Sequence, residues 1–303
     1  MNMNCDKSLL EAPSFAFDPT DPWTETFQIG LWRAGLQGRH VYEVGIGTGT
    51  NAVFLLDKCD VASASGSDID PRLTMLAIRN VAKLTPERAE RFHPVEGAVS
   101  LIDTEDARTA ITAADVVIAC LPQVGCPTDK RLAQVYSKWR GSADYSVPNK
   151  SDDHYAHYYP WSTFEEFPFN AIGLGLNQAL LQQIKLYAPC AEVIMNIGCR
   201  VGHETILNFF RANGYEPECL HTQIVRQHKE TSIAFFVAIE RILDGTGFEK
   251  EFACEFYADR DGGIRLSALK AAALLAKNAD AELFHEVTTF RCRSLGSAQI
   301  AAQ

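Results

Sequence analysis

The chain has 303 residues, of which 47% are hydrophobic and 22% are charged, and its formal net charge is -10. This length and composition can form a large core, in one domain or in one domain with an extension. The acidic balance argues against binding along nucleic acid, which requires a basic face. No apolar run approaches the ~20 residues that span a bilayer. Residues 1–22 lack the order of a secretory signal, so a cytoplasmic location is expected.

The nine cysteines are scattered and include no Cys-x-x-Cys pair. Buried cysteines behave as small hydrophobic residues, so we expect free thiols in a reducing compartment. No metal site is predicted.

From about residue 40, short β-rich runs alternate with longer helical stretches, which is typical of βαβ units and a parallel sheet. The expected strands are residues 40–44, 62–67, 92–96, 115–120, 192–197, 219–225 and 232–240, and the expected helices are 51–57, 72–83, 171–187 and 203–213. Seven strands, the last two adjacent and close to antiparallel, predict a Rossmann-like α/β domain over residues 40–240. Residues 1–39 would form an N-terminal cap, and residues 241–303 would form a small C-terminal α+β extension.

Alternating glycines follow the first expected strand in the run Glu43-Val-Gly45-Ile-Gly47-Thr-Gly49-Thr-Asn51. Glycine lets the backbone turn tightly and approach a ligand closely. The spacing is Gly-x-Gly-x-Gly, and the carboxylate of Glu43 precedes it. A pyrophosphate would be repelled there, whereas S-adenosylmethionine (SAM) carries a cationic amino group. The motif therefore favours SAM over a dinucleotide.

A second acidic motif, Asp68-Ile69-Asp70-Pro71, lies about 20 residues later at the end of the second expected strand. A carboxylate at this place can accept hydrogen bonds from both ribose hydroxyls. Asp68 is the better ribose ligand, because Asp70 directly precedes a proline and is expected to cap a helix. The two motifs together predict a SAM site that includes Ile69.

The fourth expected strand ends at Cys120-Leu-Pro122-Gln123, where open α/β sheets place their ligands. Many amine methyltransferases have Asn-Pro-Pro-Tyr or Asp-Pro-Pro-Tyr here, so with Cys120 in the first position the group that holds an amine is incomplete. We assign Cys120 and Pro122 to SAM binding and Gln123 to the catalytic site. The alternative is that Cys120 belongs to the strand core and Gln123 is an ordinary loop residue.

Residues 144–169 are rich in aromatic residues and histidines but have neither a helical nor a strand period. We expect a lid that excludes water and surrounds the sulfonium with ring faces, with Tyr155 and Tyr158 in the catalytic site. Aromatic packing without chemistry is the alternative.

With these motifs the chain resembles the methyltransferase region of plant methionine S-methyltransferases, which are class I SAM-dependent enzymes. The resemblance covers roughly residues 40–293 and is most specific at Asn196-Ile-Gly198-x-Arg200-x-Gly202 and over 222–233. It implies a class I methyltransferase fold, SAM as co-substrate and a small amino-acid-like acceptor. It also implies that Arg200 and Gln123 bind the acceptor carboxylate or line its site. A surface ion pair is the alternative for Arg200.

A small-molecule methyltransferase is the first choice of function. The isolated architecture is also similar to the azetidine-2-carboxylate synthases of bacterial natural-product pathways. In these enzymes the amine of SAM attacks its own γ-carbon and methylthioadenosine is released. A SAM-binding sensor and a nicotinamide-dependent oxidoreductase are the remaining alternatives. Residues 1–39 are expected either to cap the cofactor or to mediate formation of a homodimer.

Overall fold

The computed structural model describes residues 20–97, 101–123, 167–228, 232–246 and 252–295. Five parallel strands form the centre of the sheet in the order β3-β2-β1-β4-β5. Their bounds are β1 (His40–Val44), β2 (Ser63–Asp68), β3 (Phe92–Glu96), β4 (Val116–Ala119) and β5 (Glu192–Gly198). The α/β class predicted from the alternation of strands and helices is confirmed.

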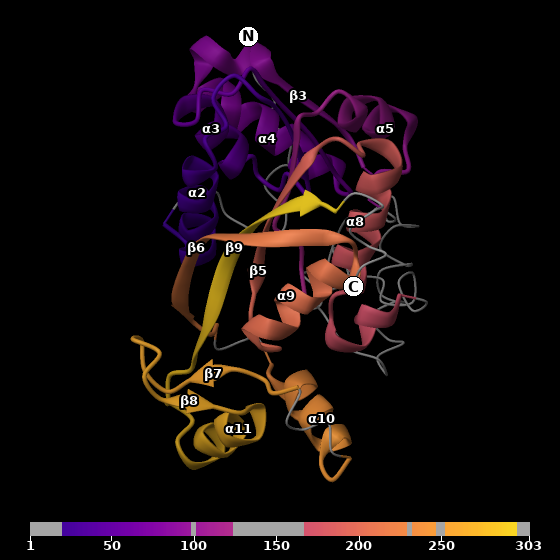
Figure 1. Cartoon of the computed structure of the whole chain (residues 1–303). Coiled ribbons are helices and arrows are strands. Elements are labelled where there is room, and N and C mark those ends of the chain that lie inside the picture. The colour runs from indigo at the N-terminus through magenta and orange to yellow at the C-terminus, as the bar shows by residue number, and fades with distance from the viewer. Residues whose placement is uncertain (1–19, 98–100, 124–166, 229–231, 247–251, 296–303) are drawn as a thin grey trace.

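The sheet continues beyond β5 with two long antiparallel strands (Figure 1). β9 (Phe284–Ser294) pairs with β5, and β6 (Tyr215–Arg226) pairs with the other edge of β9. The short strands β7 (Phe256–Tyr257) and β8 (Arg265–Leu266) pair with each other, and β7 also contacts the start of β9. The sheet order is therefore 3-2-1-4-5-9-6, so that β9, the last strand along the chain, lies between β5 and β6.

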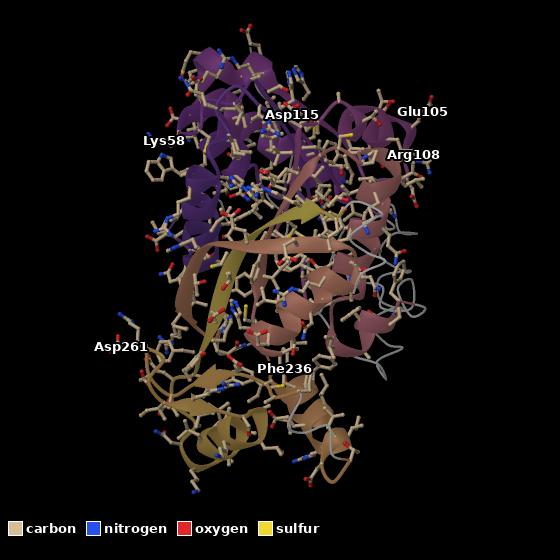
Figure 2. All side chains as sticks on the ribbon, viewed as in Figure 1. Lys58, Glu105, Arg108, Asp115, Phe236 and Asp261 are labelled. Atoms are coloured by element: carbon tan, nitrogen blue, oxygen red, sulfur yellow. The ribbon has the colours of Figure 1, made fainter. Side chains whose placement is uncertain are left out.

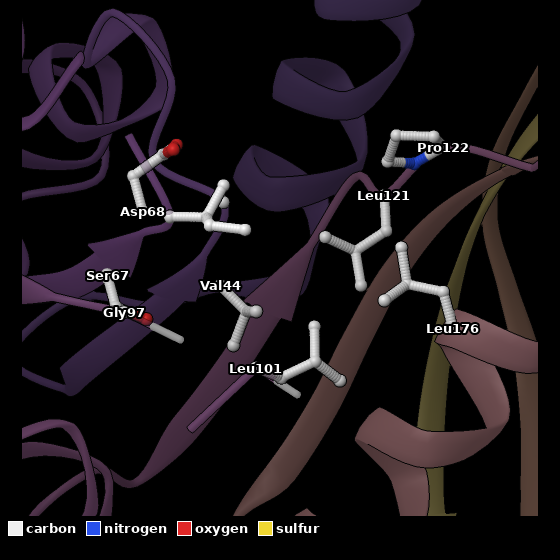
Figure 3. A pocket seen from close by; sticks show the side chains of 10 residues that line it. Val44, Ser67, Asp68, Gly97, Leu101, Leu121, Pro122 and Leu176 are labelled. Atoms are coloured by element: carbon white, nitrogen blue, oxygen red, sulfur yellow. The ribbon is translucent and has the colours of Figure 1, made fainter. Parts of the chain in front are cut away.

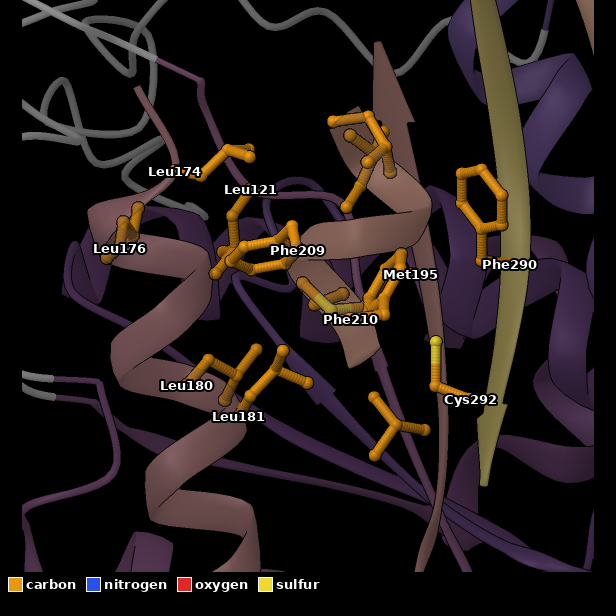
Figure 4. Packing of buried hydrophobic residues seen from close by; sticks show 14 of the residues in the cluster. Leu121, Leu174, Leu176, Leu180, Leu181, Met195, Phe209, Phe210, Phe290 and Cys292 are labelled. Atoms are coloured by element: carbon orange, nitrogen blue, oxygen red, sulfur yellow. The ribbon is translucent and has the colours of Figure 1, made fainter. Parts of the chain in front are cut away.

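Helices cover both faces of the sheet, because the strands direct apolar side chains to each face. Val116 and Ile118 of β4 pack into one hydrophobic cluster, with residues of α2 (Pro22–Ala34), α3 (Thr50–Asp57) and α4 (Pro71–Leu84). Val117 and Ala119 pack into a second cluster, with residues of α5 (Glu105–Thr112), α8 (Gly175–Tyr187) and α9 (His203–Ala212). In the second cluster, Phe209, Phe210 and Met195 lie between the leucines of α8 and Phe290 of β9 (Figure 4). The helix bounds are α2 (Pro22–Ala34), α3 (Thr50–Asp57), α4 (Pro71–Leu84), η1 (Pro86–Arg91), α5 (Glu105–Thr112), η3 (Pro168–Ile172), α8 (Gly175–Tyr187), α9 (His203–Ala212), α10 (Ala234–Leu243) and α11 (Ala268–Lys277).

Helix α2 lies against β5, β6 and β9, so this part of the expected N-terminal cap covers the sheet (Figure 1). Asp21 caps the helix by accepting a hydrogen bond from the Thr24 amide at 3.0 Å. Gly30 makes the close approach to the sheet feasible, because a Cβ there would lie 2.4 Å from Cγ2 of Thr289. Among the described residues, no helix has the length and hydrophobicity that crossing a membrane requires.

The strand predicted at residues 232–240 is wrong, because helix α10 occupies this segment. Its first residues form an apolar run, Ala234-Phe-Phe-Val-Ala-Ile239, and periodicity alone cannot distinguish a short apolar strand from a buried helix. The antiparallel strand of the sheet is instead β9, from the segment predicted to be an extension. That α11, β7 and β8 form an extension beyond the predicted domain boundary at residue 240 stays a prediction. β9 does not belong to such an extension, because it lies in the main sheet.

Candidate functional site

The candidate site lies at the carboxyl ends of β1, β2 and β4, where the order of the parallel strands changes direction between β1 and β4. Gly45, Gly47 and Gly49 have φ values of 78°, 52° and 81°, which residues with a side chain rarely adopt. At Gly49 a Cβ would also lie 2.9 Å from the Cα of Ala77 in α4. The predicted glycine loop therefore turns tightly over the strand ends and leads into α3.

Glu43, at the end of β1, is 3% exposed and accepts a hydrogen bond from Asn51 of α3, with Nδ2 2.8 Å from Oε1. Burial raises the pKa of Glu43 to about 8, with a smaller increase from the Asp68 charge, and the Asn51 hydrogen bond opposes both. Two buried acceptors remain, Oε2 of Glu43 and Oδ1 of Asn51, and neither has a hydrogen-bond partner among the described residues. A cationic amino group that reached Glu43 Oε2 would supply the hydrogen-bond donor that this atom lacks.

Asp68 is the last residue of β2, and its carboxylate binds backbone amides of the glycine loop and of the turn before α4. Oδ2 accepts a hydrogen bond from the Gly47 amide at 2.9 Å, and Oδ1 accepts one from the Asp70 amide at 3.0 Å. Asp70 caps α4, as the sequence predicts, and its carboxylate forms a buried ion pair with Arg72 at 2.8 Å. Asp68 is thus held at the rim of the pocket while the Asp70 carboxylate is engaged elsewhere.

A small pocket, with a volume of about 40 Å³, opens beside Asp68 (Figure 3). Asp68 lies at one end, and the apolar side chains of Leu101, Leu121 and Leu176 lie at the other. Four of the predicted SAM-binding residues line it, namely Gly45, Asp68, Ile69 and Pro122. Leu101 and Leu176 were not predicted, because the segment after β3 and α8 reach the pocket only through the tertiary fold, whereas Leu121 lies within the predicted motif at the end of β4. One end of the pocket can accept hydroxyl donors, and the other can cover a flat apolar ring.

Cys120 and Gln123 lie at the carboxyl end of β4, and both are engaged by β5. Asn196 Nδ2 donates a weak hydrogen bond to the Cys120 sulfur at 3.7 Å, and burial raises the pKa of this thiol to about 12. The Gln123 amide pairs with the backbone of Gly198, since Nε2 donates to the carbonyl and Oε1 accepts from the amide, both at 2.8 Å. Cys120 is therefore a neutral thiol, and Gln123 ties the chain after β4 to the end of β5.

Arg200 lies just beyond β5 in a cluster that also holds Trp23 and His285. Its guanidinium carbon is 5.4 Å from the Trp23 ring and 5.8 Å from the ring of Phe236, which Figure 2 labels. Arg200 Nη2 lies 3.1 Å from Nε2 of His285, and since a guanidinium can only donate, this ring nitrogen accepts. The arginine is thus held by aromatic rings and an imidazole at the carboxyl edge of the sheet.

His285 of β9 is 1% exposed, and burial together with the Arg200 charge holds its pKa well below the usual value. Its Nδ1 is buried and has no hydrogen-bond partner among the described residues. Its ring centroid is 5.6 Å from that of Trp23, and Trp23 in turn closes over Gly198, where a Cβ would lie 2.8 Å from the indole. Trp23 and His285 were missed in the sequence because they lie far along the chain from the recognisable motifs. The predicted Tyr155 and Tyr158, and residues 144–166 of the expected lid, lie outside the described residues.

No protein-family model matches the sequence. The methionine S-methyltransferase of Zea mays is 22% identical over 299 residues, which cover 94% of this chain and 26% of that protein. The Hordeum vulgare enzyme of the same name has the same identity and coverage. The chain therefore spans about a quarter of the length of these curated relatives.

Among solved structures, a SAM-dependent methyltransferase from Thiobacillus denitrificans in complex with S-adenosyl-L-homocysteine superposes with a TM-score of 0.38. It is 14% identical over 97% of this chain and 100% of that chain. The strand beside β5 is β9, from the segment expected to be an extension, whereas residues 219–225 and 232–240 were expected to be the last two adjacent strands. By fold and by its curated relatives, the chain is similar to the class I SAM-dependent methyltransferases.

Proposed function

We propose that this chain is a SAM-dependent methyltransferase that acts on a small amino-acid-type acceptor. The observation that carries the proposal is the pair of buried acceptors without partners, Glu43 Oε2 and Asn51 Oδ1, close to the Asp68 carboxylate. A ligand that suits this arrangement needs a cationic amino group for Glu43, hydroxyls for Asp68 and a flat apolar ring for the leucine-lined end of the pocket. SAM has all three, whereas a diphosphate would meet two carboxylates.

The acceptor is proposed to lie toward Arg200, beyond the end of β5. Its carboxylate would pair with the guanidinium of Arg200, which suits a bidentate grip on a carboxylate. Trp23 would supply an apolar face for the side chain that carries the nucleophile. The neutral thiol of Cys120, with its pKa raised to about 12, is a poor nucleophile, so the acceptor itself supplies the attacking atom.

The reaction would be a backside displacement at the methyl carbon attached to sulfur. The nucleophile forms a bond to this carbon, the carbon–sulfur bond breaks, and its electron pair stays on sulfur to give S-adenosylhomocysteine. The protein contributes mainly by positioning and by excluding water. A thioether nucleophile needs no proton removed. L-methionine, named in the curated relatives, is therefore the first acceptor to test.

Binding is tested by calorimetry with SAM, S-adenosylhomocysteine and NAD⁺. We expect both adenosyl ligands to bind and NAD⁺ not to bind, and the Asp68→Ala variant to lose about tenfold or more in SAM affinity, because two hydrogen bonds to a charged group are removed. Asp57→Ala, at an exposed acid on α3, should bind SAM normally. Binding of NAD⁺ without SAM would contradict the proposal.

Turnover is tested by incubating the protein with SAM and a panel of amino acids. The expected products are S-adenosylhomocysteine and a methylated acceptor, with SAM unchanged when no acceptor is present. Release of methylthioadenosine from SAM alone would exclude methyl transfer as the main reaction.

A further inference from the structure

A second cluster of polar side chains lies behind the Arg200–His285 pair. Cys199, His203 and Glu286 bring a thiol sulfur, an imidazole nitrogen and a carboxylate oxygen within 4.8 Å of one another. His203 Nδ1 is 2.5 Å from Glu286 Oε1, and Cys199 is fully buried. Since successive residues of a strand point to opposite faces, Glu286 faces α9 while His285 faces α2.

We propose that Cys199, His203 and Glu286 bind a divalent transition-metal ion, with Zn²⁺ as the expected occupant. A thiolate, an imidazole and a carboxylate are the three ligand types that Zn²⁺ takes in proteins, whereas Mg²⁺ and Ca²⁺ prefer oxygen alone. Three protein ligands leave one tetrahedral position for water or for Glu255. That carboxylate lies near enough to influence the pKa values of both Cys199 and His203.

The backbone already holds the three residues in place. Cys199 follows β5, and its amide donates a hydrogen bond to the Glu286 carbonyl of β9 at 2.8 Å. The next turn closes when the Gly202 amide donates to the Cys199 carbonyl at 2.8 Å, which returns His203, the first residue of α9, to the cysteine. Gly202 has a φ of 96°, so this turn requires glycine.

The side chains around the cluster are also suited to an ion. Thr288 Oγ1 donates to Glu286 Oε1 at 2.8 Å, and such hydrogen bonds orient carboxylate ligands of metals. The Cys199 thiol lies 3.8 Å from the Ile197 carbonyl and also makes hydrogen bonds with the side chains of Glu286 and Thr288. On binding, a metal–sulfur bond would form and the thiol proton would pass to solvent. The proton that His203 Nδ1 shares with Glu286 would also leave, for solvent or for Nε2, so that Nδ1 can bind the ion. With metal–ligand bonds of roughly 2.0–2.3 Å, side-chain movements on the order of 1 Å suffice.

An ion at this place would join the end of β5, the start of α9 and the start of β9. Arg200 and His285 are the direct chain neighbours of Cys199 and Glu286, so the ion would also fix the pair proposed to hold the acceptor. This second consequence rests on the proposed function, whereas metal binding itself does not.

The test uses the full chain stripped of metal with a chelator and then titrated with Co²⁺, without SAM. We expect stoichiometric binding, a thiolate-to-cobalt charge-transfer band, visible bands of tetrahedral Co²⁺ and displacement by Zn²⁺. Cys199→Ser should abolish the charge-transfer band and weaken Zn²⁺ binding at least about tenfold. His203→Gln should weaken binding similarly, and its circular dichroism and melting curve show whether it folds.

Cys190→Ser is the matched control, because Cys190 is an exposed cysteine on the loop before β5. It should keep the cobalt spectrum unchanged. The proposal is overturned if folded wild-type protein gives no charge-transfer band, if the band survives in Cys199→Ser, or if it disappears in Cys190→Ser.

Discussion

Glu43 lies in surroundings that disfavour its own charge, and this has a consequence for ligand binding. Its pKa is about 8 in the protein without ligand, because the side chain is buried and Asp68 is close. A cationic amino group placed beside it would favour the ionised form. If the amino group of SAM binds beside Glu43, as proposed, binding at pH values below 8 is accompanied by loss of a proton from Glu43.

We predict that SAM affinity rises with pH between about 6 and 8, by up to tenfold per unit, and levels off above this range. In Glu43→Gln the rise should be smaller, and binding at pH 8.5 should be weaker than in the wild type. Calorimetry in buffers of different ionisation enthalpy measures the affinity and the proton release together. The titration of SAM itself is common to both proteins, so equal pH slopes would refute the role of Glu43.

Gln123 provides a prediction about stability, since its amide both donates to and accepts from Gly198. A carboxylate can accept from the Gly198 amide but cannot donate to its carbonyl. Gln123→Glu should therefore lower the free energy of unfolding by about 1–3 kcal/mol, as read from urea denaturation. Gln182→Glu, at an exposed position of α8, should change it little. Equal effects of the two substitutions would mean that the Gly198 contacts contribute nothing.

At the residue scale, the sequence predicts the site residues that lie at the carboxyl ends of strands. Glu43, Asp68 and the glycines are recognisable because their spacing along the chain places them at the ends of neighbouring strands, where they lie close together. Trp23 and His285 are not, because their meeting with Arg200 depends on how α2 and β9 dock onto the sheet. The partner of Gln123 could not be foreseen either, since it is a backbone group 75 residues away.

At the scale of elements, α2 is attached to the sheet more tightly than its place before β1 would suggest. Its Thr26 hydroxyl lies 2.9 Å from Gln223 Oε1 of β6, and its Thr26 carbonyl accepts a hydrogen bond from Thr289 of β9 at 3.1 Å. The Trp23 carbonyl accepts another from Asn196 of β5 at 3.1 Å. The helix therefore links three strands and brings Trp23 to Arg200.

We predict that Gly30→Ala destabilises the protein by about 1–3 kcal/mol, although alanine favours helix by up to ~1 kcal/mol. The added methyl group would overlap with Thr289, so α2 would have to move away from β9. In the double variant Gly30→Ala, Thr289→Ser the clashing Cγ2 is removed, but Cβ and Oγ1 would still lie 2.5 and 2.7 Å from the methyl group, so only a small part of the loss should be recovered. Urea denaturation of the single and double variants gives the interaction free energy between positions 30 and 289. A neutral or stabilising Gly30→Ala would show that the helix can shift freely.

Helix α10 shows why element type could not always be predicted. Its apolar residues form a block, and such a block fits a buried strand or a helix equally well. The five parallel strands were easier, because short β-rich runs alternate there with longer helical stretches. α2 was expected only as a covering segment, without its bounds.

At the scale of the whole molecule, β9 joins the parts of the structure. It contacts β5 and β6 along most of its length, and it carries His285 on one face and Glu286 and Phe290 on the other. The parallel half of the sheet could be predicted from the alternation of strands and helices. The place of β9 could not, because its neighbours are set by pairing between distant segments and not by local pattern.

Phe290 gives the prediction at this scale. It is fully buried, and its ring centroid lies 5.3 Å from that of Phe210 in α9. Phe290→Ala should lower the free energy of unfolding by about 3–5 kcal/mol, because a large cavity opens between β9 and α9. Leu186→Ala, at an exposed position of α8, serves as the control and should have a small effect. A loss below about 1 kcal/mol in chemical denaturation would mean that the two elements are not packed as described.

The insertion of β9 between β5 and β6 also sets an order of events during translation. A chain grows from its amino end, so β5 and β6 leave the ribosome before the strand that will separate them exists. In that interval both have open edges that can pair with each other or with a neighbouring nascent chain. The glycine loop and Asp68 can be assembled early, whereas Arg200 must wait for His285 until β9 has been synthesised.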